Sequence, residues 1–397
     1  MRSPVLTVVA VLCSLSMAVS AVYAQDGPPP EFDMDKLKAE RPIQQRTYVM
    51  AYNDRVPGED WVTASTKTQL KPGQRVDIGT MEEIDEVVIQ RLTDRAYWVW
   101  SNVYSLTMWV GDKGVLLIDA PMNFPVQKFL EEDIKRVTDL PVRVIVYSHM
   151  HVDHIGSARN FADAIEGQGG KLRVIASQSL NQEIITHKDA ALAPTEVIPD
   201  GYATFEFEGH VFRHVTPMKV AHTSNDSYTI TPDGVAHVVD FFYPGILPLA
   251  QTSGVKDMTG YIYFLRHLLG EEWTVANLGH NNVGYKADIE LTFDYLDDLY
   301  IAAYKFWPGF EPAAMKEMSD QGHNSATMIR MLFDGVSTAM AEQVREKWSS
   351  YPHWEVAWDH AHMVVWDFAL NWDYDNARIT GVMSRAIPDI TPISPPK

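Results

Sequence analysis

The chain has 397 residues, of which 46% are hydrophobic, 52 are Asp or Glu and 33 are Lys or Arg, so the net charge is −19 at pH 7. This composition is ordinary for a globular protein, and the length allows one large domain with an addition. A surface this acidic repels nucleic acids and anionic membranes, so we expect neither as a partner.

The first 24 residues predict an export signal. Arg2 precedes an apolar run at residues 5–18, and Val22 and Ala24 fit cleavage after Ala24. The alternative is a membrane anchor, but the apolar run is short and its flank consists of small and polar residues. No later segment has about 18 uninterrupted apolar residues. We therefore expect a periplasmic or secreted protein that does not stay on the membrane.

The only cysteine, Cys13, lies inside this signal. After cleavage the chain would have no disulfide and no thiolate ligand, and its net charge would be −20 because Arg2 is lost. Any metal site would then be restricted to His, Asp, Glu and water.

Residues 25–85 predict an N-terminal leader and extension, Pro-rich and charged at 25–45 and without a clear period at 46–85. Alternating patterns and turn signals follow. Strands are predicted at residues 87–92, 96–100, 105–110, 115–119, 141–147, 173–176, 202–207, 211–215, 227–231, 235–239 and 273–278. Helices are predicted at 129–137, 158–165, 178–187 and 256–269, and then at 286–306, 311–318, 325–348 and 354–372.

Two β-rich stretches interleaved with helices indicate an α/β protein in which two sheets pack together with helices outside. We place this domain at residues 86–285 and a helical C-terminal region at 286–397. The C-terminal helices either cover a substrate cleft or form a dimerisation or packing element. A homo-oligomer is compatible with the sequence.

The most informative segment is residues 149–154, His-Met-His-Val-Asp-His. It carries four potential metal ligands in one loop between a β-branched strand and a helix that begins near Ser157. Strict alternation would send His149, His151 and Asp153 to one side and His154 to the other, so the loop could serve two metals. A surface loop without function is the alternative, but this pattern rarely arises by chance.

Three more candidate ligands stand near predicted strands. His222 precedes the second hairpin, Asp240 ends the strand at 235–239, and His280 follows the strand at 273–278. Side chains at the carboxyl ends of strands can converge on one edge of a sandwich, which would supply the ligands that a two-metal site needs beyond the loop.

Taken together, the order His-x-His-x-Asp-His, Ala-His-Thr, strand-terminal Asp and Gly-His resembles the metallo-β-lactamase superfamily of hydrolases over residues 86–285. The resemblance implies an αββα sandwich and two zinc ions per chain. It implies His149, His151 and His222 on the first zinc, Asp153, His154 and His280 on the second, and Asp240 as the bridge. Asp119, at the end of the strand at 115–119, would support a ligand by hydrogen bonding; the alternative is a turn cap. Phe241 and Phe242 depart from the small residue that often follows this bridging Asp.

The resemblance implies a zinc-dependent hydrolase in which a metal-bound hydroxide cleaves a small ester, lactone, thioester or amide. Asp153 would bind metal and act as a catalytic residue that orients the nucleophile or shuttles its proton. β-Lactam hydrolysis is the first alternative, and a sulfatase or phosphodiesterase of the same fold is a weaker one. A metal-binding scaffold without catalysis is a third, which the full ligand set disfavours.

Other suggestive residues have simpler explanations. Tyr97, Trp98, Trp100 and Tyr104 are expected to pack in the core or at an edge, although a loop near this position covers the substrate in some members of the family. His360 and His362 are two apart on a predicted helix, so they face different ways and make poor co-ligands. Histidines such as His214 and His237 lack a ligand context.

Overall fold

A computed structural model describes residues 60–78, 87–101, 103–187, 191–217, 219–307 and 312–370. The predicted export signal, the Pro-rich leader and Cys13 lie outside these residues. No helix among the residues that are described is long and apolar enough to cross a membrane.

The first sheet has seven strands in chain order. Its first four strands pair antiparallel and its last four pair parallel, with β6 shared. The strands are β3 (Val87–Arg91), β4 (Ala96–Ser101), β5 (Tyr104–Val110), β6 (Val115–Ile118), β7 (Val142–Val146), β8 (Arg173–Ser177) and β9 (Glu196–Ile198).

The second sheet has six strands, also in chain order, and only the β13–β14 pair is parallel. Its strands are β10 (Gly201–Phe207), β11 (His210–Thr216), β12 (Tyr228–Ile230), β13 (Val235–Val238), β14 (Val275–Asn277) and β15 (Val283–Gly284). The two hairpins predicted around Gly209 and around residues 232–234 are confirmed.

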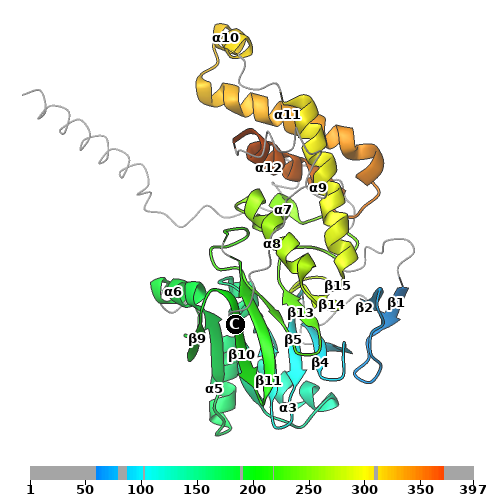
Figure 1. The fold of residues 1–397 in the computed structure, drawn as a ribbon, viewed down its shortest axis with the longest axis vertical. Helices are drawn as coiled ribbons and strands as arrows, with labels where there is room; N and C mark the ends of the chain where they lie inside the picture. The colour runs from blue at the N-terminus through cyan, green and yellow to red at the C-terminus, as the bar shows by residue number, and fades with distance from the viewer. Residues whose placement is uncertain are drawn as a thin grey trace, which may run out of the picture. The chain divides into compact units, whose positions relative to one another are not determined.

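The helices lie outside the two sheets (Figure 1). Those of the first half are α3 (Val126–Glu131), η2 (Asp133–Arg136), α4 (Val152–Ile155), α5 (Ala158–Gly167) and α6 (Gln178–Thr186). Those that follow are α7 (Ala250–Gly254), α8 (Met258–Gly270), α9 (Lys286–Phe306), α10 (Pro312–Asp320), α11 (Ser325–Trp348), η3 (Trp354–Val356) and α12 (Ala357–Leu370). Helices α10, α11 and α12 gather beyond one end of the sandwich (Figure 1).

Three apolar layers hold these elements together, as β6 illustrates. All four of its residues are fully buried, because Val115 and Leu117 face α3, α5 and α6 while Leu116 and Ile118 face the second sheet. The third layer packs the outer face of the second sheet against α8, α9, α11 and α12. The predicted αββα sandwich followed by a helical region is therefore confirmed.

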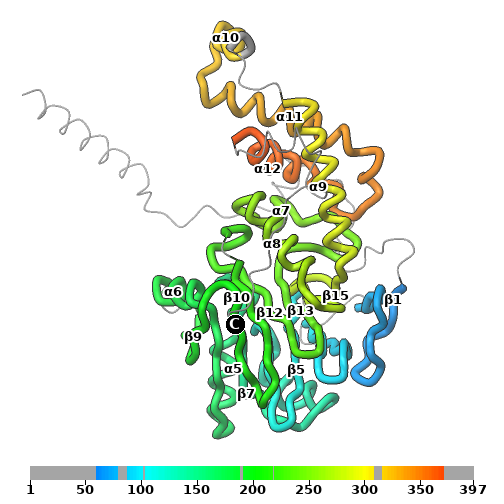
Figure 2. The backbone as a smooth tube through the Cα atoms, in the orientation of Figure 1, coloured from blue at the N-terminus to red at the C-terminus, as the bar shows by residue number. Residues whose placement is uncertain are grey.

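The C-terminal helices are amphipathic and pack on one another as well as on the sandwich. Helices α9, α11 and α12 lie side by side (Figure 2). Helix α12 also contacts α7, and His360 on α12 bonds the carbonyl of Leu249 at 2.9 Å. The helical region thus braces the segment that leads into α7.

The structure departs from the predicted elements at several places, and the short elements α4, β9, α7 and β15 were not predicted. The helix predicted at residues 129–137 is interrupted at Glu132, where φ is −126°, and continues as the 3₁₀ turn η2. The helix predicted from residue 354 begins with the 3₁₀ turn η3. Strands β1 (Asp60–Thr63) and β2 (Gln74–Asp77) form a parallel pair in a segment where no period was evident.

Candidate metal centre

All seven predicted ligands come together at one edge of the sandwich. Helix α4 begins at Val152, so Asp153 and His154 lie on one helical turn directly after the loop that follows β7. Asp240 follows β13 and His280 follows β14, two strands that pair in parallel and therefore end at the same edge. His222 lies in the connection between β11 and β12.

The ligand atoms form two groups. His149, His151, His222 and Asp240 make the first, and Asp153, His154 and His280 make the second; within each group the atoms lie within 4.8 Å of one another. Strict alternation through the loop would have placed Asp153 beside His149 and His151, whereas the resemblance implied a place beside His154 and His280, and this second grouping is the one found. Because the chain turns helical at Val152, Asp153 joins His154 instead.

Asp240 lies between the two groups. Its Oδ2 atom is 3.5 Å from Nε2 of His149 and 3.3 Å from Nε2 of His222. The same oxygen is 3.0 Å from Nε2 of His154, and Oδ1 is 3.1 Å from Nε2 of His280. Asp240 therefore contacts histidines of both groups.

Asp153 completes the second group. Its Oδ2 atom is 3.3 Å from Nε2 of His154 and 3.4 Å from Nε2 of His280. Its side chain is 26% exposed, whereas those of His154 and Asp240 are 0% and 5% exposed. The cluster is thus closed on the protein side and opens to solvent at Asp153.

These spacings fit zinc. Ligands at 2.0–2.1 Å from a tetrahedral zinc lie about 3.3 Å apart, and neighbouring ligand atoms in the cluster are separated by distances such as 2.9 Å (His222 Nε2 to His151 Nδ1) and 3.5 Å (His149 Nε2 to Asp240 Oδ2). The buried Nε2 atom of His149 has no hydrogen-bond partner, which is costly for a group that no cation binds. An imidazole and carboxylate set of this kind suits zinc.

Burial and charge set the proton affinities of the histidines differently in the two groups. Burial lowers the pKa of His149 well below its usual value and also lowers the pKa of His151. Burial acts in the same direction on His154, but the charge of Asp240 and a hydrogen bond to Asp153 outweigh it and raise the pKa of His154 to about 10. His149 and His151 are therefore neutral imidazoles, the form that binds a metal.

The two carboxyl groups are held as carboxylates. Burial alone would raise the pKa of Asp240, but the charges of His154 and His280 outweigh it and lower that pKa well below its usual value. Burial alone would also raise the pKa of Asp153. The hydrogen bonds from His154 and His280 have the larger combined effect, so the pKa of Asp153 is lowered as well. Both side chains carry the negative charge that a cation requires.

Asp119 does not touch a predicted ligand directly. It accepts hydrogen bonds from the backbone N–H of Ser148 at 2.8 Å and from the Ser148 hydroxyl at 2.7 Å. That hydroxyl lies 3.1 Å from Nδ1 of His149. Asp119 therefore supports His149 through Ser148, and it is not merely a turn cap.

Further supports were missed in the sequence. Asp226 accepts hydrogen bonds from the backbone N–H groups of His222 and Thr223, both at 2.9 Å from its Oδ2 atom, which fixes the loop that carries His222. Asn225 accepts a bond of 2.9 Å from the backbone N–H of Met150 and bonds Glu183 of α6. Asp226 stands four residues after His222, a short-range pattern that could have indicated a loop cap.

The aromatic residues divide between core and site. Trp98 and Trp100 stack in the core, and both are at most 2% exposed. Tyr104 is different: its ring packs edge-on against His154 and His280, at centroid distances of 6.2 and 5.1 Å. Burial, followed by the charges of Asp153 and Asp240, raises the pKa of Tyr104, so it stands at the cluster as a neutral phenol.

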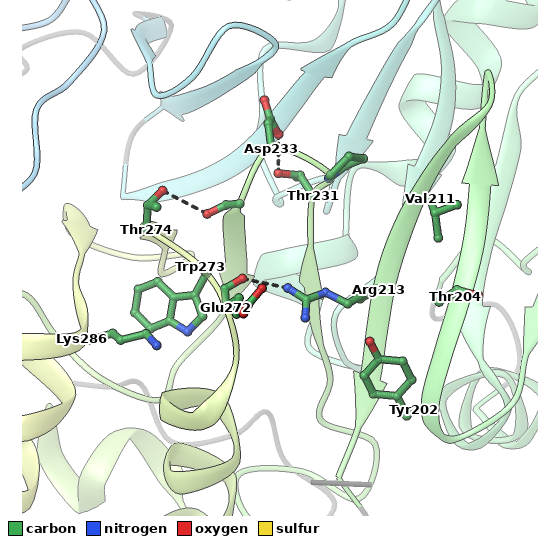
Figure 3. Close-up of a pocket in the computed structure, with 12 residues that line it drawn as sticks. Tyr202, Thr204, Val211, Arg213, Thr231, Asp233, Glu272, Trp273, Thr274 and Lys286 are labelled. Atoms are coloured by element: carbon green, nitrogen blue, oxygen red, sulfur yellow. Dashed lines mark hydrogen bonds between the residues drawn. The ribbon is translucent and has the colours of Figure 1, made fainter. Parts of the chain in front are cut away.

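A separate groove of about 910 Å³ lies at the opposite end of β13 (Figure 3). Asp233 and Gly234 line it, and they precede β13 whereas Asp240 follows it. Arg213 in this groove bonds Glu271 at 2.8 Å and the carbonyl of Glu272 at 2.7 Å. None of the seven clustered residues lines this groove.

Comparisons with known proteins identify relatives of part of the chain. Residues 98–268 match the family model of the metallo-beta-lactamase superfamily. A linear primary-alkylsulfatase of Pseudomonas sp. (strain ATCC 19151) is 23% identical over 91 residues, which are 23% of this chain and 17% of that protein. An (R)-specific secondary-alkylsulfatase of Pseudomonas sp is 29% identical over 83 residues, 21% of this chain and 12% of that protein.

A third relative is matched over a longer stretch. The 2,4-dinitroanisole O-demethylase subunit alpha of Nocardioides sp. (strain JS1661) is 24% identical over 207 residues, 50% of this chain and 60% of that protein. The chain therefore covers less than two thirds of the length of each of these relatives.

Solved structures with a similar fold include a metallo-beta-lactamase from Pontibacter korlensis and the DIM-1 metallo-beta-lactamase. The first is 17% identical with a TM-score of 0.45 and covers 53% of this chain and 98% of its own. The second is 15% identical with a TM-score of 0.44 and covers 53% of this chain and 96% of its own.

Proposed function

We propose that the seven-residue cluster holds two zinc ions for the hydrolysis of a small ester, lactone, thioester or amide, because residues 98–268 match the family model of the metallo-β-lactamase superfamily and the cluster offers two groups of metal-binding side chains. The observation that carries this proposal is the position of Asp240, whose Oδ2 atom is 3.3 Å from His222 in the first group and 3.0 Å from His154 in the second.

In this proposal each zinc has its own histidines. His149, His151 and His222 would hold the first ion, Asp153, His154 and His280 would hold the second, and Asp240 lies within reach of both groups. Two zinc ions, when bound, would supply Lewis acidity and lower the pKa of a shared water towards neutrality.

The chain's own residues have distinct tasks in the reaction. Asp153 is the partly exposed carboxylate at the mouth of the cluster, so it is placed to accept a hydrogen bond from the attacking water and to carry its proton towards the leaving atom. Tyr104 packs against His154 and His280 and excludes water from that side. The buried carboxylate of Asp240 keeps both histidine groups oriented.

Sulfate-ester hydrolysis is the second candidate, because two of the curated relatives are alkylsulfatases. Those relatives are matched over 17% and 12% of their length, so the carbonyl substrates remain the first proposal. β-Lactam hydrolysis is a third substrate class, compatible with export.

A substrate panel separates these candidates. Zinc-loaded protein would be assayed on an aryl ester, a lactone, a thioester, nitrocefin and an alkyl sulfate, beside H151A and the matched control H362Q on α12. We expect carbonyl turnover that H151A abolishes and H362Q retains. Turnover of the alkyl sulfate alone would favour the second candidate, and a zinc-loaded wild-type protein inactive on all five would favour a non-catalytic metal scaffold.

We also propose that the protein is exported with its first 24 residues removed, and that it acts on a small molecule without nucleic acid or membrane partners. The acidic net charge of −19 supports the partner proposal. Intact mass of the protein recovered outside the cytoplasm tests the cleavage, since the mass shows whether the chain begins at Gln25.

A further inference from the structure

A chain of hydrogen-bonded groups runs through the interior of the sandwich and connects the two halves of the cluster. The side chains between its ends are at most 1% exposed. From one end to the other, the members are His149, Ser148, Asp119, His237, Thr107, Asn277 and the backbone of Gly279.

His237 is the central member, and it was expected to have no ligand context. Its Nε2 atom lies 2.9 Å from Oδ2 of Asp119, and its Nδ1 atom lies 3.0 Å from the hydroxyl of Thr107. It projects from β13 of the second sheet, whereas Asp119 and Thr107 belong to the first sheet. His237 therefore links the two sheets directly below the cluster.

The donors and acceptors along this row of hydrogen-bonded groups have one arrangement when His237 is a neutral imidazole. A carboxylate only accepts, so Nε2 of His237 donates to Asp119 and Nδ1 accepts from Thr107. Thr107 accepts from the side-chain amide of Asn277 at 3.0 Å. The oxygen of Asn277 accepts from the backbone N–H of Gly279 at 3.0 Å, next to His280.

The same logic fixes His149 at the other end. The Ser148 hydroxyl donates to Asp119 at 2.7 Å, so its oxygen must accept from Nδ1 of His149. The lone pair of His149 is then on Nε2, the buried atom without a hydrogen-bond partner that lies 3.5 Å from Asp240. The tautomer of His149 that can bind a metal is thus set by Asp119 through Ser148.

We propose that His237 is a positioning residue of the metal centre: by holding Asp119 between the two sheets, it fixes the orientation and tautomer of His149. This inference rests on the proposed function for the metal but concerns a residue that contacts no metal. Without the His237 bond, the Asp119 carboxylate keeps hydrogen bonds only to Ser148 among the residues that the structure describes, so the two side chains can turn together away from His149.

His214, which is not part of this row of hydrogen-bonded groups, is a matched control for His237. It is also 0% exposed, lies on β11 of the same sheet and bonds a threonine, Thr229, at 2.9 Å. Its Nε2 atom has no hydrogen-bond partner, so it does not hold Asp119. Replacing His214 removes a comparable buried imidazole without breaking the connection to His149.

The test uses the full chain, stripped of metal by a chelator and titrated with Co²⁺ as a spectroscopic probe. We expect H237L to weaken the binding of one of two Co²⁺ ions about 10–100-fold and to change the visible absorption of the ion at that site. H237Q keeps an N–H donor for Asp119 and should recover part of the affinity, and H214L should bind like the wild type. Circular dichroism and unfolding of the metal-free variants verify that each is folded.

If H237L does not fold, T107V is measured instead, since it leaves His237 in place and removes the hydroxyl that holds the other side of its ring. If H237L, or T107V where H237L does not fold, binds Co²⁺ with the affinity and the visible spectrum of the wild type, the inference is overturned. A wild-type protein that binds two Co²⁺ ions but hydrolyses no substrate would refute the proposed hydrolase, while the comparison of H237L with H214L would still decide the role of His237.

Discussion

Oδ2 of Asp240 lies 3.0 Å from Nε2 of His154, although the two residues are far apart in the chain. Asp240 belongs to the first ligand group and His154 to the second, so this contact joins them. The backbone at Asp240 is left-handed, with φ of 68°, a conformation that Asp and Asn tolerate better than other residues with a side chain. The local backbone therefore favours an acidic or amide residue here.

Asp240→Asn is the variant that removes this negative charge while keeping the side-chain shape and the left-handed backbone. We expect it to bind fewer than two zinc ions and to lose more than about 100-fold in kcat/KM, because neither group keeps its shared anionic ligand. Metal analysis and steady-state kinetics measure both effects. Two tightly bound zinc ions in D240N would show that Asp240 is not the bridge.

Gly279→Ala should disrupt the cluster from the backbone. A Cβ atom at Gly279 would lie 2.3 Å from Val239 Cγ1 and 2.9 Å from His154 Cε1, and φ is 76°. Gly234 is the matched control, because its φ is 84° but its Cβ would have no neighbour closer than 3.8 Å. We expect G234A to cost about 1 kcal/mol of stability through strain alone, and G279A to cost more and to reduce zinc binding. Urea unfolding and zinc titration of both variants measure these effects. Equal losses of stability and of zinc affinity in G279A and G234A would show that the close contacts of a Cβ at residue 279 do not matter.

Arg75 connects the β1–β2 segment to the start of α9. Its guanidinium donates to Oδ1 of Asp288 at 2.6 Å and to the carbonyl of Val283 at 2.9 Å, and the two side chains of the ion pair are 7% and 5% exposed. Arg75→Met would leave a buried carboxylate without its cation, so we expect a loss of about 3 kcal/mol in urea unfolding. The double variant R75M/D288N should recover part of that loss. A loss below about 1 kcal/mol in R75M would indicate that this segment contributes little to the fold.

Stability should fall on mild acidification because of His360. Burial lowers the pKa of His360 to about 4, and the ring bonds Tyr295 at 3.0 Å and the carbonyl of Leu249 at 2.9 Å. In the unfolded chain His360 binds a proton near pH 6.5, whereas in the folded protein it does so only near pH 4. The contribution of the neutral ring to stability is therefore fully present above pH 6.5 and is lost as the pH falls towards 4. The loss would be up to roughly 3 kcal/mol.

The comparison of H360Q with wild-type protein isolates this contribution. Urea unfolding of metal-free protein between pH 7 and pH 4 should decline less steeply for H360Q than for the wild type. H323Q, at a half-buried position after α10, provides a control. Parallel wild-type and H360Q profiles would show that His360 is not responsible.

Local patterns predicted most of the sandwich and the seven residues that cluster at its edge. The β-branched run before His149 and the turn residues at Gly209 and Gly234 act over a few residues, so the strands and hairpins follow from them directly. The seven candidate ligands were recognised because each stands at or near a strand end in an order typical of one family. Their shared edge is then a consequence of sheet topology.

The remaining features depend on contacts between distant segments, which no local pattern encodes. His237 looks like any buried strand histidine until β13 pairs and brings it 2.9 Å from Asp119. The β1–β2 pair is short and lacks a period, and β2 is held by Asn282, whose side chain bonds both the N–H and the carbonyl of Val76. Alternation of side chains applies to strands, but the candidate ligands at residues 149–154 lie in a loop that turns helical at Val152. Strict alternation therefore does not describe where Asp153 points.

The zinc content of the purified protein shows directly whether the seven-residue cluster holds two metal ions. Chelator-stripped wild-type protein would be reloaded with zinc, freed of excess ion and analysed by mass spectrometry of the metal, beside D240N and the H214L control. We expect two zinc ions per chain in the wild type and in H214L, and fewer in D240N. A wild-type protein that retains no zinc, or a D240N variant that retains two, would contradict this expectation.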